Sequence, residues 1–177
     1  MISNIIGITG KISSGKSTLS KYLIEQSDWK LVSFGGYLVN FSKENGLPIT
    51  RPALQSLGEQ MIQNDALEFL DKVLEFSNVA NDKIIVEGIR HLIIWKELQK
   101  KSEHSTLIYV EASRELRYRR FCSRLKEGDD PVSFERFQEL DEHEVESEIE
   151  SLKGVADITL TSESTEMTEF IKSFVGY

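Results

Sequence analysis

The sequence predicts an α/β fold, a three-layer α/β/α sandwich in which about five parallel strands are covered by helices on both faces. Short apolar runs alternate along the chain with stretches of helical periodicity, which is typical of a parallel sheet joined by crossover helices. The chain has 177 residues, only 3 prolines and no internal repeat. Because this length suits one hydrophobic core, we expect residues 1–177 to form a single domain.

The first predicted strand is Ile2–Thr9, an apolar run that leads into a glycine. A helix is predicted over residues 16–26, where Leu19, Tyr22 and Leu23 recur at helical spacing. A glycine-containing turn therefore joins a buried strand to a helix near the start of the chain.

A second short strand is predicted at residues 30–34, and we expect the glycines at 35–36 to end it before a helix over residues 37–45. The segment 47–52 contains two prolines and predicts a turn. A long amphipathic helix is predicted over residues 52–76. Its apolar face consists of Leu54, Leu57, Met61, Leu70, Val73 and Leu74.

Two further apolar runs, Lys83–Glu87 and residues 106–111, predict the third and fourth strands. We expect a helix over residues 91–101 to connect them. The remaining elements alternate in the same way: a basic helix over residues 114–126, a loop over 127–131, an acidic helix over 132–152, a fifth strand at 157–161 and a closing helix over 164–174.

The junction after the first strand reads GKISSGKST and fills every fixed position of the phosphate-binding motif G-x-x-x-x-G-K-[ST]. Glycines let such a loop turn its backbone N–H groups toward one point, and the helix that follows adds its N-terminal N–H groups. We expect Lys16 to reach the β- and γ-phosphates of a nucleotide and Ser17 to offer its hydroxyl to Mg²⁺. The alternative is a glycine-rich junction without a ligand. The residues expected to bind the nucleotide are Gly10, Ser13, Ser14, Gly15, Lys16, Ser17 and Thr18.

A phosphate site of this kind also needs a carboxylate at the tip of a neighbouring strand, to hold Mg²⁺ or its water. Glu87 ends an otherwise apolar strand, so we expect it to be catalytic and, with Ser17, to bind the metal. Gly88 is expected to let a substrate approach the backbone, and Arg90 to bind a phosphate group. An ion pair between Glu87 and Arg90 is the alternative, and His91 suits a helix cap or the surface.

The predicted basic helix contains Arg114, Arg117, Arg119, Arg120, Arg124 and Lys126. Arg117, Arg120 and Arg124 share one helical face because they lie three and four residues apart. Phosphoryl transfer requires charge neutralisation, so we expect Arg120 and Arg124 to be catalytic and to act from a lid of about residues 114–150. The alternative is a solvated basic face that pairs with the acidic helix after it.

The acidic helix is most simply a solvated surface, with Asp141 or Glu144 as candidates for a catalytic or lid-closing role. The formal net charge of −8 makes nucleic acid an improbable partner, because binding along its backbone needs clustered Lys and Arg. The single cysteine, Cys122, allows no internal disulfide and fits a reducing cytosol. No apolar stretch approaches the roughly 20 residues of a membrane span. We therefore expect a cytoplasmic protein without membrane contact; its oligomeric state stays open.

These segments together resemble the nucleotide-kinase group of P-loop proteins, and most of all dephospho-CoA-kinase-like and adenylate-kinase-like proteins. The resemblance covers nearly the whole chain and rests on GITGKISSGKST, VSFGGYL, LQSLGEQM, VEGIRH, RELRYRRFCSRLKEGDDPVSFERFQELDEHE and ADITLTSES. It implies a P-loop NTPase fold, ATP or another NTP with Mg²⁺ as cofactors, and a small-molecule phosphate acceptor. It also implies that Ser33, Phe34 and Tyr37 border the acceptor site and that Arg90 contacts the acceptor's phosphate.

The chain departs from true dephospho-CoA kinases at the end of the second strand, where those enzymes carry an aspartate suited to deprotonating a hydroxyl. Here the segment reads LVSFGG and has no carboxylate. Gly36, Val39 and Leu140 also stand where relatives often carry charged residues. A phosphate acceptor needs no base, so we expect a nucleoside monophosphate rather than the hydroxyl of dephospho-CoA, unless Glu87 is itself the base.

The sequence thus predicts a Mg²⁺- and ATP-dependent phosphotransferase that moves the γ-phosphoryl group to a nucleotide-like small molecule. Two alternatives stay open. One is a kinase acting on a modified base in nucleic acid, which the net charge disfavours. The other is a non-catalytic NTP-binding regulatory protein, which the departures at Gly36, Val39 and Leu140 would explain. The choice between ATP and GTP also stays open.

Overall fold

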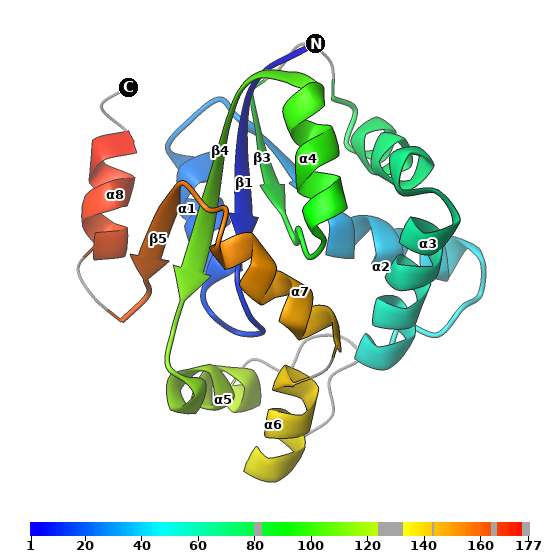
Figure 1. Cartoon of the computed structure of the whole chain (residues 1–177), viewed down its shortest axis with the longest axis vertical. Helices are drawn as coiled ribbons and strands as arrows, with labels where there is room; N and C mark the ends of the chain where they lie inside the picture. Colours follow the sequence, from blue (N-terminus) through cyan, green and yellow to red (C-terminus); the bar gives the residue numbers. More distant parts are fainter. Residues whose placement is uncertain (80–82, 124–132, 143, 164–165, 175–177) are drawn as a thin grey trace.

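The computed structural model describes residues 1–79, 83–123, 133–142, 144–163 and 166–174. Within these residues the predicted fold class is confirmed, with a parallel sheet between two layers of helices (Figure 1). None of the described helices combines the length and the hydropathy that a bilayer crossing requires.

The described part of the sheet has five strands: β1 (Ile2–Thr9), β2 (Lys30–Ser33), β3 (Lys83–Glu87), β4 (Ser102–Glu111) and β5 (Ile158–Thr161). Their order is β2-β3-β1-β4-β5, and every neighbouring pair is parallel. The glycine-rich loop follows the central strand β1, so it lies between the carboxyl ends of β3 and β4. Ligands bind at this edge in open parallel sheets.

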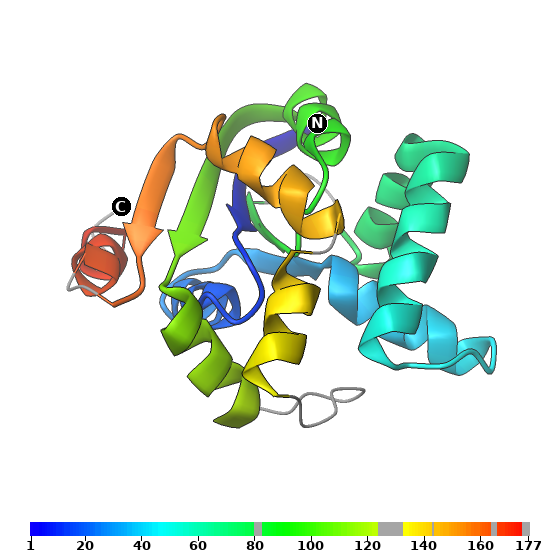
Figure 2. The ribbon, with the colours of Figure 1, turned by 60° about the horizontal axis from the view of Figure 1, so that its bottom comes forward.

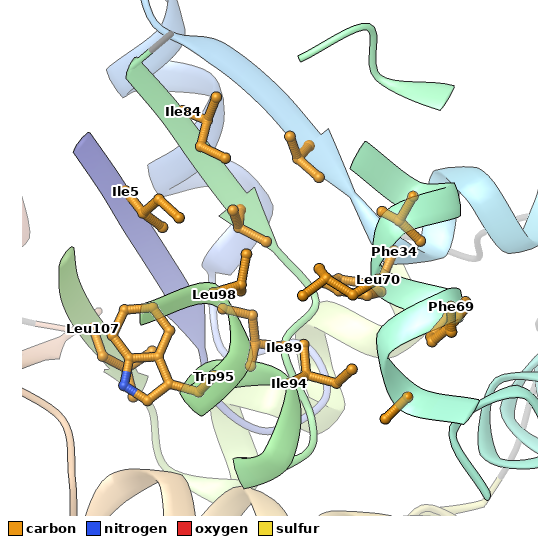
Figure 3. Packing of buried hydrophobic residues seen from close by; sticks show 14 of the residues in the cluster. Ile5, Phe34, Phe69, Leu70, Ile84, Ile89, Ile94, Trp95, Leu98 and Leu107 are labelled. Carbon is orange, nitrogen blue, oxygen red and sulfur yellow. The ribbon is translucent and has the colours of Figure 1, made fainter. Parts of the chain in front are cut away.

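The helices in chain order are α1 (Lys16–Glu25), α2 (Phe34–Glu44), α3 (Arg51–Phe76), α4 (Leu92–Lys100), α5 (Arg114–Ser123), α6 (Phe134–Asp141), α7 (Glu144–Lys153) and α8 (Glu166–Phe174). On one face of the sheet, Leu19 and Leu23 of α1 pack against strand residues that include Ile8, and α8 lies beside them. On the other face, α3 and α4 form the larger core (Figure 3). Figure 2 shows α5 and α6 side by side, away from both of these layers.

The larger core explains why β1 contains a glycine at position 7. Trp95 of α4 is almost fully buried and, together with Leu98, lies against the sheet, in the same core as Leu107 of β4 (Figure 3). A Cβ atom at Gly7 would lie 2.7 Å from Cζ3 of Trp95 and 2.8 Å from Cδ1 of Ile89. Any larger residue would therefore push α4 away from the sheet, at a cost of about 1–3 kcal/mol.

The helix predicted over residues 37–45 begins earlier, at Phe34, which corrects the expectation that the glycines at 35–36 would separate it from the second strand. The reason is a helix cap. Ser33 has an extended backbone, and its hydroxyl accepts a hydrogen bond from the backbone N–H of Gly36 at 3.1 Å. Such a cap starts a helix at the next residue, so the strand ends at Ser33 and both glycines lie in the first turn of α2.

The long helix α3 contains a break that the periodicity did not reveal. Asp65 has an extended backbone (φ −162°, ψ 103°), and its Oδ1 accepts hydrogen bonds from the N–H groups of Leu67 and Glu68, both at 2.9 Å. Asp65 therefore caps a second helical segment within α3. The two segments present different faces to the rest of the molecule.

The acidic helix predicted over residues 132–152 is two helices, α6 and α7, which corrects that prediction. Ser133 caps α6 by accepting a hydrogen bond from the N–H of Arg136 at 3.2 Å. The helix ends at Asp141, whose side chain turns inward to a buried arginine. The fourth strand begins at Ser102 rather than at residue 106. The predicted loop over 127–131 lies outside the described residues.

Candidate active site

The glycine-rich loop turns between β1 and α1 by means of three residues with positive φ: Gly10 (139°), Ser13 (58°) and Gly15 (114°). Gly15 is the residue before α1, so the first helical residue is Lys16. The Lys16 ammonium folds over the loop and donates hydrogen bonds to the carbonyl oxygens of Gly10 at 2.7 Å and Lys11 at 2.6 Å. This arrangement holds a cation at the N-terminus of a helix, where anions bind.

Glu87 lies beside the first turn of α1, although it is 70 residues away in the sequence. Its Oε1 accepts a hydrogen bond from the Ser17 hydroxyl at 2.5 Å, and its Oε2 accepts one from the Ser20 hydroxyl at 2.9 Å. The parallel pairing of β1 with β3 places Glu87 opposite Ile8, two residues before the loop begins. Sheet order therefore brings the carboxylate to the hydroxyl.

Ser20 was missed by the sequence reasoning. It is buried, and it lies three residues after Ser17, so the two hydroxyls share one face of α1. A polar side chain on the buried face of a helix that follows a phosphate loop is a signal that could have identified it.

These side chains line one end of a cleft with a volume of about 690 Å³. The loop end of the cleft is lined by Ile12, Ser13, Ser14, Gly15, Lys16, Ser17, Thr18, Glu87, Arg120, Ser162 and Met167. The rest of the cleft is lined by residues of α2, by residues of α3, by residues 88–91 and by Ile94. The cleft is thus long enough to join two different sets of side chains.

Arg120 connects α5 to the phosphate loop. Its guanidinium donates hydrogen bonds to the Ser14 carbonyl oxygen at 3.0 Å and to the Ser162 hydroxyl at 2.7 Å. Ser162 directly follows β5 and lies on the same cleft wall as Met167. Arg120 therefore bridges the loop and the segment after the last strand, with its charge at the loop.

Arg117 does not share the position of Arg120, although both were expected on one face. Its guanidinium is buried and binds both carboxylate oxygens of Asp141, at 2.7 Å between Nη2 and Oδ2. Arg117 also donates hydrogen bonds to the backbone oxygens of Ala112 at 3.2 Å and Ile12 at 3.5 Å. The pair thus ties α6 to α5 and to the phosphate loop.

A second cationic side chain, that of Arg114, also contacts Asp141. The Nε of Arg114 lies 3.2 Å from its Oδ2. Burial by itself raises the pKa of Asp141, but the hydrogen bonds and the charge of Arg117, together with Lys11 and Arg114, outweigh burial and hold this pKa below its usual value. Asp141 is therefore a structural carboxylate and not a proton acceptor.

The helix α7 reaches the site through two acidic side chains. Glu150 lies 2.9 Å from the ammonium of Lys11, and Glu148 lies 2.8 Å from Nδ1 of His91. Lys11 belongs to the phosphate loop, and His91 follows β3 and lines the cleft. The acidic helix is thus in part a contact surface for the site and not only a solvated face.

The rest of the cleft contains most of the residues expected near the acceptor. Ser33, Phe34, Gly88 and Arg90 all line it. Tyr37 is a correction, because it is absent from the described lining. Its buried ring stacks in the core instead, with centroid distances of 5.9 Å to Phe41 and Phe69 and 5.7 Å to Phe76.

Arg124 and Lys126, from the predicted basic helix, lie outside the described residues. Of the two arginines expected to act from a lid, only Arg120 can be placed. Within the described part of the chain, no three His, Cys, Asp or Glu side chains cluster as a metal site. At the loop, the structure brings together the Ser17 hydroxyl and the Glu87 carboxylate.

Comparison with known proteins agrees with this architecture. Residues 6–151 match the family described as the AAA domain. A UPF0200 protein of Pyrobaculum aerophilum is 28% identical over 166 residues, which cover 94% of this chain and 91% of that protein. A UPF0200 protein of Methanococcus maripaludis strain C7 is 30% identical over 167 residues, which cover 90% of this chain and 87% of that protein.

Among solved structures, shikimate kinase from Bacteroides thetaiotaomicron superimposes with a TM-score of 0.59 and 13% identity, over 97% of this chain and 94% of that one. A gluconokinase from Sinorhizobium meliloti superimposes with a TM-score of 0.56 and 13% identity, over 99% and 91%. At these identities the likeness shows the fold alone. That fold is the P-loop kinase fold, and it implies that a nucleotide binds at the loop.

Proposed function

The chain belongs to the AAA domain family and to the UPF0200 proteins, and from its fold and its cleft we propose that it is a Mg²⁺-dependent kinase that transfers the γ-phosphoryl group of ATP to a small anionic acceptor. The observation that carries the proposal is the continuous cleft. It is lined by the phosphate loop and also by two arginines from other elements, Arg51 and Arg90. A protein that only bound a nucleotide would need no second set of charged side chains. The names of the two kinases with the same fold, which act on small molecules, support this view.

Ser17 and Glu87 fit a magnesium site, because a hydroxyl and a carboxylate 2.5 Å apart supply the oxygen ligands that Mg²⁺ prefers. When bound, Mg²⁺ would neutralise charge on the β- and γ-phosphates. Ser20 holds the other carboxylate oxygen of Glu87 and would fix its orientation.

Each basic residue of the cleft has a separate role in the proposal. Lys16 would exchange its hydrogen bonds to the loop carbonyls for the β- and γ-phosphates. Arg120 would offset charge on the transferred group from the side of α5. Arg90 would orient the acceptor with two parallel hydrogen bonds. Arg124 stays a prediction, as does the lid of about residues 114–150.

The acceptor that suits this site best is a nucleoside monophosphate. Ser33 ends β2 where a hydroxyl kinase would place a base, and both oxygens of Glu87 already accept hydrogen bonds from Ser17 and Ser20. Glu87 is therefore less suited to deprotonate a hydroxyl than the sequence alone suggested. A phosphate oxygen attacks without such a base, so the site favours a phosphate acceptor over the hydroxyl of dephospho-CoA.

The proposal is tested by measuring ADP release from ATP and Mg²⁺ against a panel of nucleoside monophosphates, dephospho-CoA and a small hydroxyl acceptor. We expect one acceptor to stimulate release, and Lys16→Ala to lower kcat/KM with that acceptor by at least about 100-fold. Lys21→Ala is the matched control, because Lys21 is an exposed lysine on the same helix. Full activity in Lys16→Ala, or no stimulation by any acceptor, would refute the kinase assignment.

A further inference from the structure

The first segment of α3 presents a polar stripe to the cleft. Arg51, Gln55 and Glu59 lie at successive intervals of four residues, and all three line the cleft. Residues four apart lie above one another on a helix, so these side chains form one row. An inward-facing helix stripe is normally apolar, and three polar side chains in that position indicate that the stripe faces a ligand.

The break at Asp65 allows this stripe to exist. After the break, α3 turns Phe69, Leu70 and Val73 into the core, where all three are buried. Before the break, the same helix faces the cleft, and only Gly58 is fully buried. Without the break, one continuous stripe of α3 would have faced the rest of the molecule along the whole helix. The capped break lets the first segment present its polar stripe to the cleft, while the second segment supplies most of the buried core residues of α3 and adds Phe69 to the cleft lining.

Gln55 and Glu59 are half-buried, and neither side chain makes a hydrogen bond or ion pair with another described residue. They lie one helical turn apart, beside the apolar side chains of Leu54 and Ile62. A carboxylate and an amide against an apolar wall are costly unless hydrogen-bond donors and acceptors reach them. The ligand itself is the source of those partners that best fits the cleft.

We infer that Gln55 and Glu59 read the ring edge of the acceptor, and that the acceptor is a guanine-type nucleoside monophosphate; the inference rests on the proposed function. An ionised carboxylate only accepts hydrogen bonds, so Glu59 pairs with two adjacent N–H donors. The amide of Gln55 can donate to a neighbouring carbonyl oxygen. One acceptor beside two donors is the pattern of O6, N1–H and N2–H₂ of guanine.

The same pair of side chains selects against other bases. Adenine presents an unprotonated N1 beside its amino group, and cytosine presents N3 and O2, so each would direct a lone pair at the Glu59 carboxylate. Such an unpaired contact in a partly desolvated site is a strong basis for discrimination. Uracil offers one N–H between two carbonyl oxygens and would satisfy Glu59 only in part.

The phosphate of this acceptor would lie at the other end of the stripe. Arg51 is eight residues before Glu59, which corresponds to about 12 Å along the helix axis. Its guanidinium lies 5.6 Å from the ring centre of Phe121, and Phe121 packs against Ile12 of the phosphate loop. Within the stripe, Arg51 is therefore the residue that lies toward the phosphate loop. The phosphate contact at Arg51 thus lies nearer the phosphate loop than the base contact at Glu59. In-line transfer requires this order, because the acceptor phosphate must face the γ-phosphate.

The test compares GMP, IMP and AMP as ligands and as acceptors, in the wild-type protein and in Glu59→Gln. Calorimetry measures binding without requiring turnover, and ADP release measures transfer. We expect GMP to be preferred over AMP by about 10- to 100-fold, and Glu59→Gln to remove most of that preference while leaving AMP nearly unchanged. IMP, which lacks the 2-amino group, should fall between them. Glu75→Gln, on an exposed part of α3, should match the wild type.

The outcomes separate this inference from the kinase assignment. Binding of GMP that depends on Glu59, without ADP release, would retain the inference and refute the transfer reaction. Transfer to AMP or dephospho-CoA in preference to GMP would overturn the inference and retain the kinase. Equal losses for all nucleotides in Glu59→Gln, or no nucleotide binding at the acceptor wall, would also overturn it.

Discussion

Asp141→Asn should destabilise the protein strongly, although Asp141 lies outside the cleft lining. The carboxylate is 1% exposed and binds the guanidinium of Arg117, which is itself 4% exposed. Arg114 approaches the same carboxylate at 3.2 Å. Asparagine keeps the shape of the side chain but removes its charge. The substitution therefore leaves a buried guanidinium without a counter-ion while changing little of the packing.

The magnitude follows from that burial. Removal of one partner from a buried ion pair typically costs about 3–5 kcal/mol, because the remaining charge stays desolvated. For a chain of this size, each kcal/mol corresponds to about 2–4 °C in melting temperature. We therefore expect a decrease of roughly 6–20 °C, with a lower urea midpoint. Arg117 also holds the backbone at Ile12, so the apparent affinity for ATP should fall as well.

The assay is urea unfolding at pH 7, with Glu142→Gln as the matched control. Glu142 contacts Arg114 at 3.4 Å, but its side chain is 65% exposed, so its loss should cost at most about 1 kcal/mol. A stability change in Asp141→Asn as small as that in Glu142→Gln would refute the reasoning. It would mean that the Arg117 pair is solvated and contributes no more than a surface contact.

The same pair predicts a pH dependence with a defined sign. The pKa of Asp141 is lower in the folded protein than its usual value of 3.8, so the unfolded chain takes up the proton first as the pH falls. The stabilisation is therefore complete above the unfolded pKa of about 3.9 and is lost as the pH falls below it toward the folded pKa. The stability difference between wild type and Asp141→Asn should be constant from pH 5 to 8 and should shrink below about pH 4.

Three further substitutions test the site around the loop. Glu87→Gln removes the charge of the expected metal ligand. We expect kcat to fall about 100- to 1,000-fold and the Mg²⁺ concentration for half-maximal activity to rise. An unchanged Mg²⁺ titration would show that Glu87 does not bind the metal. Gly10 has a φ of 139°, and Gly10→Ala would place a Cβ 2.3 Å from the Val110 carbonyl oxygen. Thermal unfolding should therefore show a decrease of about 1–3 kcal/mol in the free energy of unfolding. Gly35→Ala, with open space around the added Cβ, should instead gain about 0.4–1 kcal/mol. Equal stabilities for these two glycine variants would contradict the loop geometry.

The predicted site residues that the structure brings together beside the loop are those whose signal in the sequence is local. Lys16 and Ser17 occupy fixed positions of a motif, and the strand and helix on either side are evident from hydrophobic pattern. Glu87 was suggested by a charge at the end of an apolar run. Ser20 and Glu59 were missed, since a serine or glutamate within a helix is unremarkable until its neighbours across the fold are known.

The arginine helix shows where periodicity is insufficient. Arg117 and Arg120 are three residues apart and were expected to point the same way. In the structure, Arg120 lies at the loop and the cleft, whereas Arg117 is drawn into a buried pair with Asp141. A difference of about 60° around a helix axis is enough to place two similar side chains in different environments. The position of α6 decides the environment of Arg117, and the positions of the phosphate loop and of Ser162 decide that of Arg120.

The sequence by itself determined the α/β class, the position of the phosphate loop and the identity of its lysine and serine. These depend on free-energy preferences of short segments, such as strand formation by apolar runs and turns at glycine, and such preferences act within a few residues. The tertiary structure alone decided that β3 lies beside β1, that α3 breaks at Asp65 and that Tyr37 joins the core instead of the cleft. Those outcomes depend on which distant surfaces pack best together, and no local pattern in one chain specifies that choice.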